Sequence, residues 1–236
     1  MLLIGHRGAS GYEPENTLSA FQKAIVMKCD GIELDVHMSK DHELVVIHDE
    51  TLERTTSGDG FVSEKELHEL QSLDAGGWYG QMHVGSSIPT LESVFQLIPK
   101  GLLINVEIKG KSDEAWTIEK RLLELVYKYE LLENILVSSF NHVVLKNIRM
   151  MDSEIRIGVL IKEHDDNLIA YIEDYELNAY SVHPSLDIVN DKMVKELKNK
   201  GYKVFPYTVN EQEQASSFMK MGVDGIFTDY PDLMIK

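Results

Sequence analysis

The sequence predicts an α/β fold, a (β/α)8 TIM barrel with a small insertion after the second β segment. Short apolar runs alternate with amphipathic helical patterns, which is typical of a parallel sheet. Eight β segments can be identified if the apolar run at 44–47 is an extension or partner of the second one. The length, 236 residues, suits such a barrel. We therefore expect one domain over residues 1–236, with the insertion at about 50–89.

The predicted elements alternate along the whole chain. Strands are expected at 2–4, 31–38, 102–108, 135–139, 155–161, 179–182, 203–209 and 225–228. Helices are expected at 18–27, 90–98, 113–130, 141–151, 165–175, 189–199 and 211–221. A doubly wound open sheet would show a similar alternation. However, no Gly-x-Gly-x-x-Gly follows the first strand, which disfavours the nucleotide-binding version of that fold.

Two helix starts carry capping signals. Asn16 or Thr17 can cap the first helix, and capping is the role we favour for Asn16. Within the insertion only residues 63–73 look helical, and Ser63 with Glu66 matches a capping box there. Glycine-containing turns interrupt the rest of the insertion, so we expect a rim or a lid.

The composition excludes several classes of function. Lys and Arg number 23 against 39 Asp and Glu, a formal net charge of -16 that repels nucleic acid and anionic membranes. The single cysteine, Cys29, allows no intrachain disulfide and no cysteine zinc site. Neither a signal peptide nor a transmembrane run of about 18 apolar residues is recognisable. We expect a cytoplasmic protein without stable membrane association, whose insertion could also form a homodimer contact.

The second predicted strand is the first stretch that indicates chemistry. Alternate residues of a strand face opposite sides, so Ile32, Leu34 and Val36 point one way and Glu33 and Asp35 the other. Two carboxylates about 7 Å apart along a strand raise each other's pKa unless a positive charge lies between them. A divalent cation with oxygen ligands is the simplest explanation, and a solvated acidic face is the alternative.

A later strand repeats this pattern. Glu107 occupies the polar face of the strand at 102–108, and Lys109 follows on the same face. Active sites of (β/α)8 barrels lie at the C-terminal ends of the strands, so Glu33, Asp35 and Glu107 could converge there. Ligation by oxygen alone favours Ca²⁺ or Mg²⁺ over a softer metal.

Histidines and cations lie at neighbouring strand ends. A histidine side chain ordinarily titrates near neutral pH, so one of His6 and His48 could act as a general base and the other as a general acid. Arg7 and Lys109 could hold phosphate oxygens. Each residue alone would more often be structural. Together with a metal they supply the charge stabilisation, nucleophile activation and leaving-group protonation that hydrolysis of a phosphate ester requires.

These residues resemble the motifs of the glycerophosphodiester phosphodiesterases. The matching segments, in order, are His6-Arg7-Gly8, Glu15-Asn16-Thr17, Glu33-Leu34-Asp35-Val36, Val46-Ile47-His48-Asp49, residues 51–56, residues 88–91, residues 105–109, Ser138-Ser139-Phe140 and residues 222–229. The resemblance covers nearly the whole chain. It implies a (β/α)8 barrel and metal-dependent hydrolysis of small-molecule glycerophosphodiesters to sn-glycerol 3-phosphate and an alcohol.

The resemblance also implies roles for individual residues. It assigns metal ligation to Glu33, Asp35 and Glu107, acid/base catalysis to His6 and His48, and phosphate binding to Arg7 and Lys109. Tyr207 stands where the family usually has Trp, and its smaller ring is expected to alter packing against the glycerol moiety. Phe140 could contact substrate or belong to the core.

Two other functions are compatible with the same residues. A phospholipase of the same superfamily would act on intact lipids, and Trp78-Tyr79 could then be an apolar contact, but the net charge argues against it. A non-catalytic metal- or phosphate-binding barrel would not need both histidines. The head-group alcohol, the choice between Ca²⁺ and Mg²⁺, the division of acid and base roles, and direct water attack against a cyclic phosphate remain open from the residues alone.

Overall fold

A computed structural model describes residues 1–109 and 117–232. Its barrel strands are β1 (Leu2–Gly5), β2 (Gly31–Met38), β4 (Leu103–Ile108), β5 (Ile135–Ser139), β6 (Arg156–Ile161), β7 (Ser181–Pro184), β8 (Lys203–Val204) and β9 (Gly225–Thr228). The helices around them are α1 (Leu18–Val26), α3 (Leu91–Leu97), α4 (Thr117–Lys128), α5 (His142–Met151), α6 (Leu168–Asp174), α7 (Asp191–Asn199) and α8 (Gln212–Met221). No described helix is both long and apolar enough to cross a membrane.

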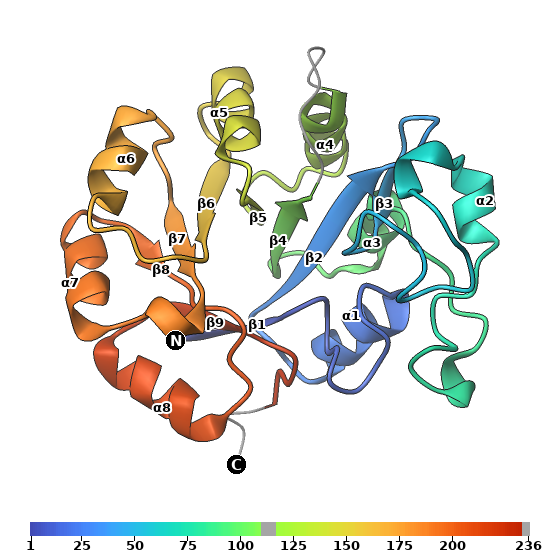
Figure 1. Ribbon diagram of the computed structural model, residues 1–236, viewed down its shortest axis with the longest axis horizontal. Helices are drawn as coiled ribbons and strands as arrows, with labels where there is room; N and C mark the ends of the chain where they lie inside the picture. The colour runs from blue at the N-terminus through green and yellow to red at the C-terminus, as the bar shows by residue number, and fades with distance from the viewer. Residues whose placement is uncertain (110–116, 233–236) are drawn as a thin grey trace.

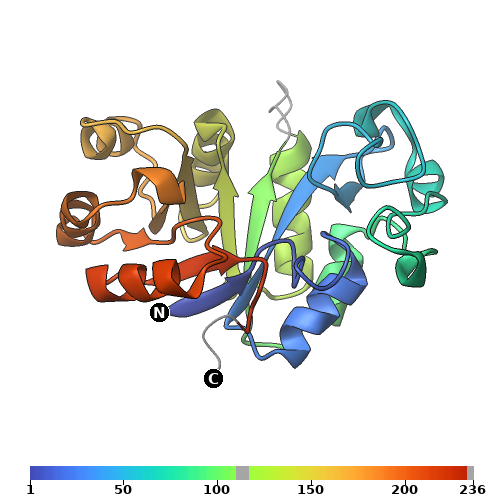
Figure 2. The same cartoon turned by 60° about the horizontal axis from the view of Figure 1, so that its bottom comes forward.

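The strands follow the order β8-β7-β6-β5-β4-β2-β1-β9 and neighbours are parallel. Helices lie on the outside of this sheet, and the first and last strands of the chain, β1 and β9, lie side by side (Figures 1 and 2). Backbone hydrogen bonds from Asp224 to Val204, Phe227 to Pro206 and Val209 to Phe227 join the two ends of the sheet. The predicted (β/α)8 barrel is confirmed as a nearly closed ring.

The barrel strands bury two different faces. Outward-facing residues such as Ile32, Leu34 and Val36 are fully buried against the helices, and each contributes about 1.5–3 kcal/mol on the usual scale of apolar transfer. Inside the ring, a small apolar cluster contains Leu136 and Phe205. Polar side chains fill the rest of the interior, so the barrel combines an apolar outer core with a polar centre.

The insertion leaves the barrel through an antiparallel strand. β3 (Leu44–Val46) pairs with the end of β2, so it is a partner of that strand rather than a barrel strand. Beyond it the insertion forms α2 (Leu67–Gln71) and two 3-10 turns, at Val62–Glu64 and Gln81–His83. These segments pack around their own apolar cluster, which includes Leu52, Leu70 and Ile88, and they lie beside β2 and β3 (Figure 1).

Some predicted boundaries are wrong. The helix expected at 63–73 is a 3-10 turn followed by the short α2, because Ser63 lies inside the turn. The cap of α2 is Glu66, whose backbone N–H donates to Glu69 Oε2 at 2.8 Å. The strand expected at 203–209 ends at Val204, since Pro206 has no N–H to donate. The strand expected at 179–182 is Ser181–Pro184. Residues 113–116 of the predicted helix at 113–130 lie outside the described residues.

Candidate active site

A cavity of about 170 Å³ opens at the C-terminal ends of the barrel strands. Eight of the nine residues that the sequence singled out line it: His6, Arg7, Glu33, His48, Glu107, Lys109, Phe140 and Tyr207. The ninth, Asp35, is buried in contact with two of them, since its carboxylate lies 3.4 Å from Arg7 Nε and 3.7 Å from Lys109 Nζ. The structure therefore brings all nine residues to one place.

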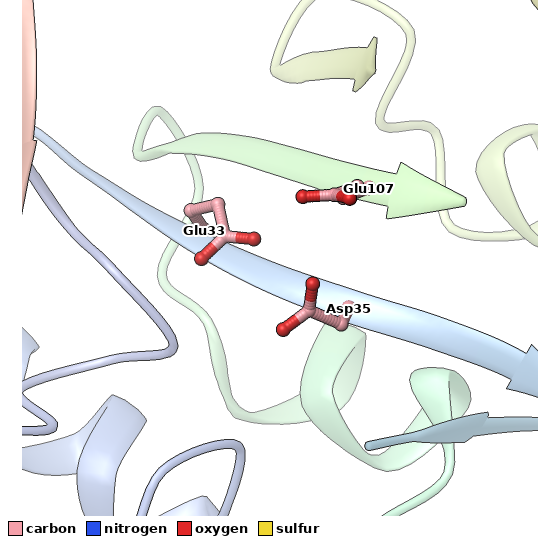
Figure 3. A group of neighbouring side chains, drawn as sticks. All are labelled: Glu33, Asp35 and Glu107. Atoms are coloured by element: carbon pink, nitrogen blue, oxygen red, sulfur yellow. The ribbon is translucent and has the colours of Figure 1, made fainter. Parts of the chain in front are cut away.

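Three carboxylates form the acidic centre of this cavity. Asp35 on β2 is paired in register with Glu107 on β4, and Glu33 precedes Asp35 on the same face. One oxygen from each of the three residues lies within 4.8 Å of the others. Figure 3 shows the three carboxyl groups turned toward one another from the two neighbouring strands. All three residues are buried.

The electrostatics of this cluster favour a bound positive charge. Burial and the nearby charge of Asp35 raise the pKa of Glu33 well above its ordinary value and that of Glu107 to about 7. Burial would also raise the pKa of Asp35, but the charges of Arg7 and Lys109 outweigh it and lower that pKa. Glu33 Oε1 is buried without a hydrogen-bond partner among the described residues. An unpaired buried carboxylate oxygen is costly, so the cluster fits a divalent cation.

Two cations flank the carboxylates. The backbone N–H of Arg7 donates to Glu33 Oε2 at 2.7 Å, in a left-handed conformation with φ 55°. Lys109 Nζ donates to Glu107 Oε1 at 2.8 Å and to His48 Nε2 at 3.0 Å. Although burial disfavours a charged lysine, Glu107 and Asp35 raise the pKa of Lys109. Both residues are therefore charged at the edge of the cavity.

Each of the two histidines is oriented by a carboxylate. His6 Nδ1 lies 2.7 Å from Asp229 Oδ1. Although burial would raise the pKa of Asp229, the hydrogen bond from His6 lowers it to about 2, so this carboxylate is an acceptor. His48 Nδ1 lies 2.6 Å from Asp49 Oδ1. Since Lys109 can only donate to His48 Nε2, His48 carries its proton on Nδ1. In both pairs Nδ1 faces the carboxylate, so Nε2 of each ring points away from it.

Two aromatic side chains form one wall of the cavity. The rings of Phe140 and Tyr207 meet edge to face with centroids 5.9 Å apart, and Phe140 remains 46% exposed. The hydroxyl of Tyr207 donates to the carbonyl of Ile161 at 3.0 Å. This bond ties the hydroxyl to the backbone, so it is the ring of Tyr207 that is available to a ligand.

The expected role of Asn16 as a helix cap is wrong. Thr17 caps α1 instead, because its side chain accepts from the N–H of Ala20 while its backbone is extended. Asn16 has φ 60° and turns inward, where Nδ2 donates to Asp35 Oδ2 at 2.8 Å. In addition, the N–H of Asp35 donates to Asn16 Oδ1 at 3.3 Å. Asn16 therefore supports a carboxylate of the acidic centre.

Sequence reasoning assigned no role to three further polar residues that line the cavity or support its lining: Asp49, Asp229 and His183. Asp49 and Asp229 lie in segments that resemble known motifs, but no pattern along the chain shows that each of them binds a histidine. His183 lies in the cavity wall, fully buried, with Nε2 at 2.8 Å from Ser181 Oγ and no partner for Nδ1 among the described residues. Burial lowers the pKa of His183 to about 3, so this ring is neutral.

Comparisons with known proteins agree with this geometry. Residues 6–233 match the model of the glycerophosphoryl diester phosphodiesterase family. A glycerophosphodiester phosphodiesterase of Caldanaerobacter subterraneus is 41% identical over 99% of this chain and 96% of that protein. One from Bacillus subtilis is 33% identical over 100% of this chain and 86% of its own length.

Solved structures agree as well. A phosphodiesterase of Oleispira antarctica, in complex with the product sn-glycerol-3-phosphate, superposes with a TM-score of 0.92 at 32% identity, over 98% of this chain and 94% of that one. A glycerophosphodiester phosphodiesterase of Thermotoga maritima has a TM-score of 0.82 at 29% identity, over 100% and 97% of the two chains. The chain thus belongs to the glycerophosphoryl diester phosphodiesterase family, a family of phosphodiesterase enzymes.

Proposed function

We propose that this enzyme hydrolyses glycerophosphodiesters to sn-glycerol 3-phosphate and an alcohol at the cavity described above. The observation that carries the proposal is the meeting of three kinds of group in one cavity: an acidic centre with an unpaired oxygen, two cations, and two carboxylate-bound histidines. The product complex of the Oleispira antarctica relative supports the identity of the phosphate-containing product.

The acidic centre of Glu33, Asp35 and Glu107 would hold the divalent cation, Ca²⁺ or Mg²⁺. All three offer oxygen ligands, which both metals prefer. When bound, such a cation supplies positive charge to a non-bridging phosphate oxygen. Asn16 orients Asp35 and the backbone of Arg7 orients Glu33, so the ligand oxygens are held in place by the fold.

Arg7 and Lys109 bind the phosphate oxygens and offset the negative charge that develops during the reaction. Nε2 of His6, and Nε2 of His48 once Lys109 turns from it to the phosphate, exchange protons with the reacting groups. One ring takes the proton of the attacking oxygen and the other protonates the departing alkoxide. Asp229 and Asp49 hold the other nitrogen of each ring, which sets the tautomer and the direction of transfer. Phe140 and Tyr207 provide an apolar wall for the organic part of the substrate.

The test measures release of glycerol 3-phosphate from several soluble glycerophosphodiesters, before and after treatment with a chelator. We expect loss of activity on chelation and recovery with Ca²⁺ or Mg²⁺. Titration calorimetry should show that Asp35→Asn weakens metal binding, because one of three buried ligands loses its charge. Release without any dependence on added metal, or unchanged metal affinity in Asp35→Asn, would contradict the assignment of the centre.

A parallel assay on lipid vesicles separates the two enzyme alternatives. We expect activity on the soluble, deacylated substrate and little on intact phospholipid, because the net charge of -16 disfavours approach to an anionic surface. The opposite preference would favour the phospholipase. If metal and glycerol 3-phosphate bind but no diester is hydrolysed, the protein is a non-catalytic binding barrel.

A further inference from the structure

Arg54, a residue of the insertion, bridges two carboxylates, Asp49 and Glu15, each of which contacts a residue that lines the cavity. Its Nε donates to Asp49 Oδ2 at 2.5 Å and its Nη2 to Asp49 Oδ1 at 3.1 Å. The same guanidinium donates from Nη1 to Glu15 Oε2 at 2.9 Å and from Nη2 to Glu15 Oε1 at 2.7 Å. Both carboxylates are thus held in the bidentate fashion that a planar guanidinium allows. Arg54 does not line the cavity itself.

Each of these carboxylates also holds a group that faces the cavity. Asp49 Oδ1 accepts from Nδ1 of His48 at 2.6 Å. Glu15 Oε1 accepts from Nη1 of Arg7 at 2.7 Å. A continuous chain of charged contacts therefore runs from His48 through Asp49, Arg54 and Glu15 to Arg7. These contacts connect His48, a proposed acid/base group, to Arg7, a residue proposed to bind phosphate.

The charges explain why this series of contacts depends on Arg54. The side chain of Glu15 is largely buried, and among the described residues only Arg7 would remain as its cationic partner without Arg54. Arg7 is itself shared, since its Nε lies 3.4 Å from Asp35 and its backbone N–H binds Glu33. Asp49 would keep its contact to His48 but lose its two bonds to Arg54, one on each oxygen, so its side chain could rotate. Removing Arg54 therefore loosens the supports of His48 and Arg7 at once.

We propose that Arg54 is a positioning residue for catalysis, which sets His48 through Asp49 and Arg7 through Glu15 in one arrangement. This inference rests on the proposed function, because His48 and Arg7 matter only if diester hydrolysis occurs in the cavity. The insertion then contributes directly to the active site, since it provides the guanidinium that completes the arrangement. A displacement of about 1 Å in a reacting group can lower a rate about 100-fold, so the expected effect is large for a residue outside the cavity.

A purely structural role would be different. In that case Arg54 would only fasten the insertion to the barrel, and its loss would lower stability and leave the kcat of the folded fraction intact. Arg121 offers a matched control. It also joins two carboxylates, Glu43 at 2.8 Å and Glu124 at 3.3 Å, is likewise part-exposed, and lines no wall of the catalytic cavity.

The experiment compares four forms of the metal-loaded enzyme: wild type, Arg54→Gln, Arg54→Lys and Arg121→Gln. Steady-state hydrolysis of a soluble glycerophosphodiester gives kcat and KM, and thermal unfolding gives the folded fraction. We expect Arg54→Gln to lower kcat by roughly 10- to 100-fold and to raise KM, with an unfolding midpoint close to that of Arg121→Gln. Arg121→Gln should keep wild-type kcat. Arg54→Lys should recover only part of kcat, because an ammonium lacks the planar fork needed to hold both carboxylates.

Double variants test the two routes. If Arg54 acts through Asp49, Arg54→Gln combined with Asp49→Asn should lower kcat by less than the product of the single effects. If it acts through Glu15, Arg54→Gln combined with Glu15→Gln should raise KM by less than the product of the two single effects. Additive effects in both pairs, or an Arg54→Gln enzyme with the kcat of Arg121→Gln, would overturn the inference alone. A wild-type enzyme that hydrolyses no glycerophosphodiester would overturn the proposed function and this inference together.

Discussion

The two histidines at the cavity, His6 and His48, are each held by a carboxylate, but the groups that support the two carboxylates differ. His6 follows β1, and its carboxylate Asp229 follows β9, the strand beside it in the barrel. Asp229 is further bound by neutral groups, the hydroxyl of Ser10 at 2.9 Å and the amide of Asn210 at 2.6 Å. His48 and Asp49 lie at the start of the insertion, and Asp49 is bound by the charged Arg54.

The same pairing of imidazole and carboxylate is thus built in two ways. On the His6 side, adjacent barrel strands supply both members, and hydrogen bonds from uncharged donors hold the carboxylate. On the His48 side, the supporting carboxylate comes from the chain segment leaving the barrel, and an ion pair to Arg54, which also binds Glu15, holds it. In the ion pair the donor is charged as well as the acceptor, which strengthens the contact at the more exposed histidine, His48 (28% against 19% for His6).

Loss of either ring should have the greatest effect on the reaction. His6→Ala and His48→Ala should each lower kcat by about 10²–10⁴-fold, because each removes a positioned proton-transfer group. Both enzymes should remain folded by circular dichroism. A diester whose leaving group is a nitrophenolate, which needs no protonation, distinguishes the two rings. The variant whose defect shrinks on that substrate has lost the general acid. Near-normal turnover of either variant on a glycerophosphodiester would contradict the acid/base assignment.

Loss of the supporting carboxylates should have the next greatest effect. Asp229→Asn and Asp49→Asn should each lower kcat by roughly 10- to 100-fold, since an amide can hold the wrong tautomer of the ring. We expect Arg54→Gln to reproduce the Asp49→Asn defect and to leave the Asp229 side untouched. Steady-state kinetics of the single and double variants would reveal this. Equal coupling of Arg54→Gln to both carboxylates would mean that the two sides act as one network.

A smaller effect concerns stability against pH. The folded-state pKa of Asp229 is about 2, below its ordinary value of about 3.9. A lowered pKa means stability that is present above about pH 4 and is lost as the pH falls through about 2. The difference between the two pKa values corresponds to about 2.5 kcal/mol at neutral pH. Urea unfolding should therefore show wild type more stable than Asp229→Asn at about pH 7, with the difference narrowing between about pH 4 and 2. A constant difference over that range would contradict it.

The weakest effect is expected from the neutral partners of Asp229. Ser10→Ala removes a hydroxyl whose proton is shared between this carboxylate at 2.9 Å and the carbonyl of His6 at 2.7 Å, and should cost about 1 kcal/mol of unfolding free energy. We expect kcat to change by less than about 3-fold, because His6 and Asn210 still hold Asp229. Thermal unfolding and steady-state assays measure both. A loss as large as that of Arg54→Gln would show that the His6 side depends on its outer contacts just as strongly.

Much of the fold was predictable because it depends on local pattern. Alternation of apolar and polar residues in β2 and β4 indicated which face of each strand turns inward, and the register of Asp35 beside Glu107 follows from two such strands being neighbours. Predictions failed where a tertiary contact outweighed a local preference. Asn16 is a good helix cap by propensity. Its amide instead donates to the buried Asp35, which would otherwise lose a hydrogen bond, while Thr17 caps the helix.

Local pattern alone was enough to predict the barrel, the inward direction of Glu33, Asp35 and Glu107, and two histidines at strand ends, since period-two alternation and strand order are readable along the chain. The side chains that support these groups depend instead on how distant segments meet. Asp229 reaches His6 across 223 positions of sequence, and Glu15 reaches Arg54 across 39. Such contacts arise from the closing of the ring and the folding back of the insertion, and no local pattern encodes the distance between residues that far apart.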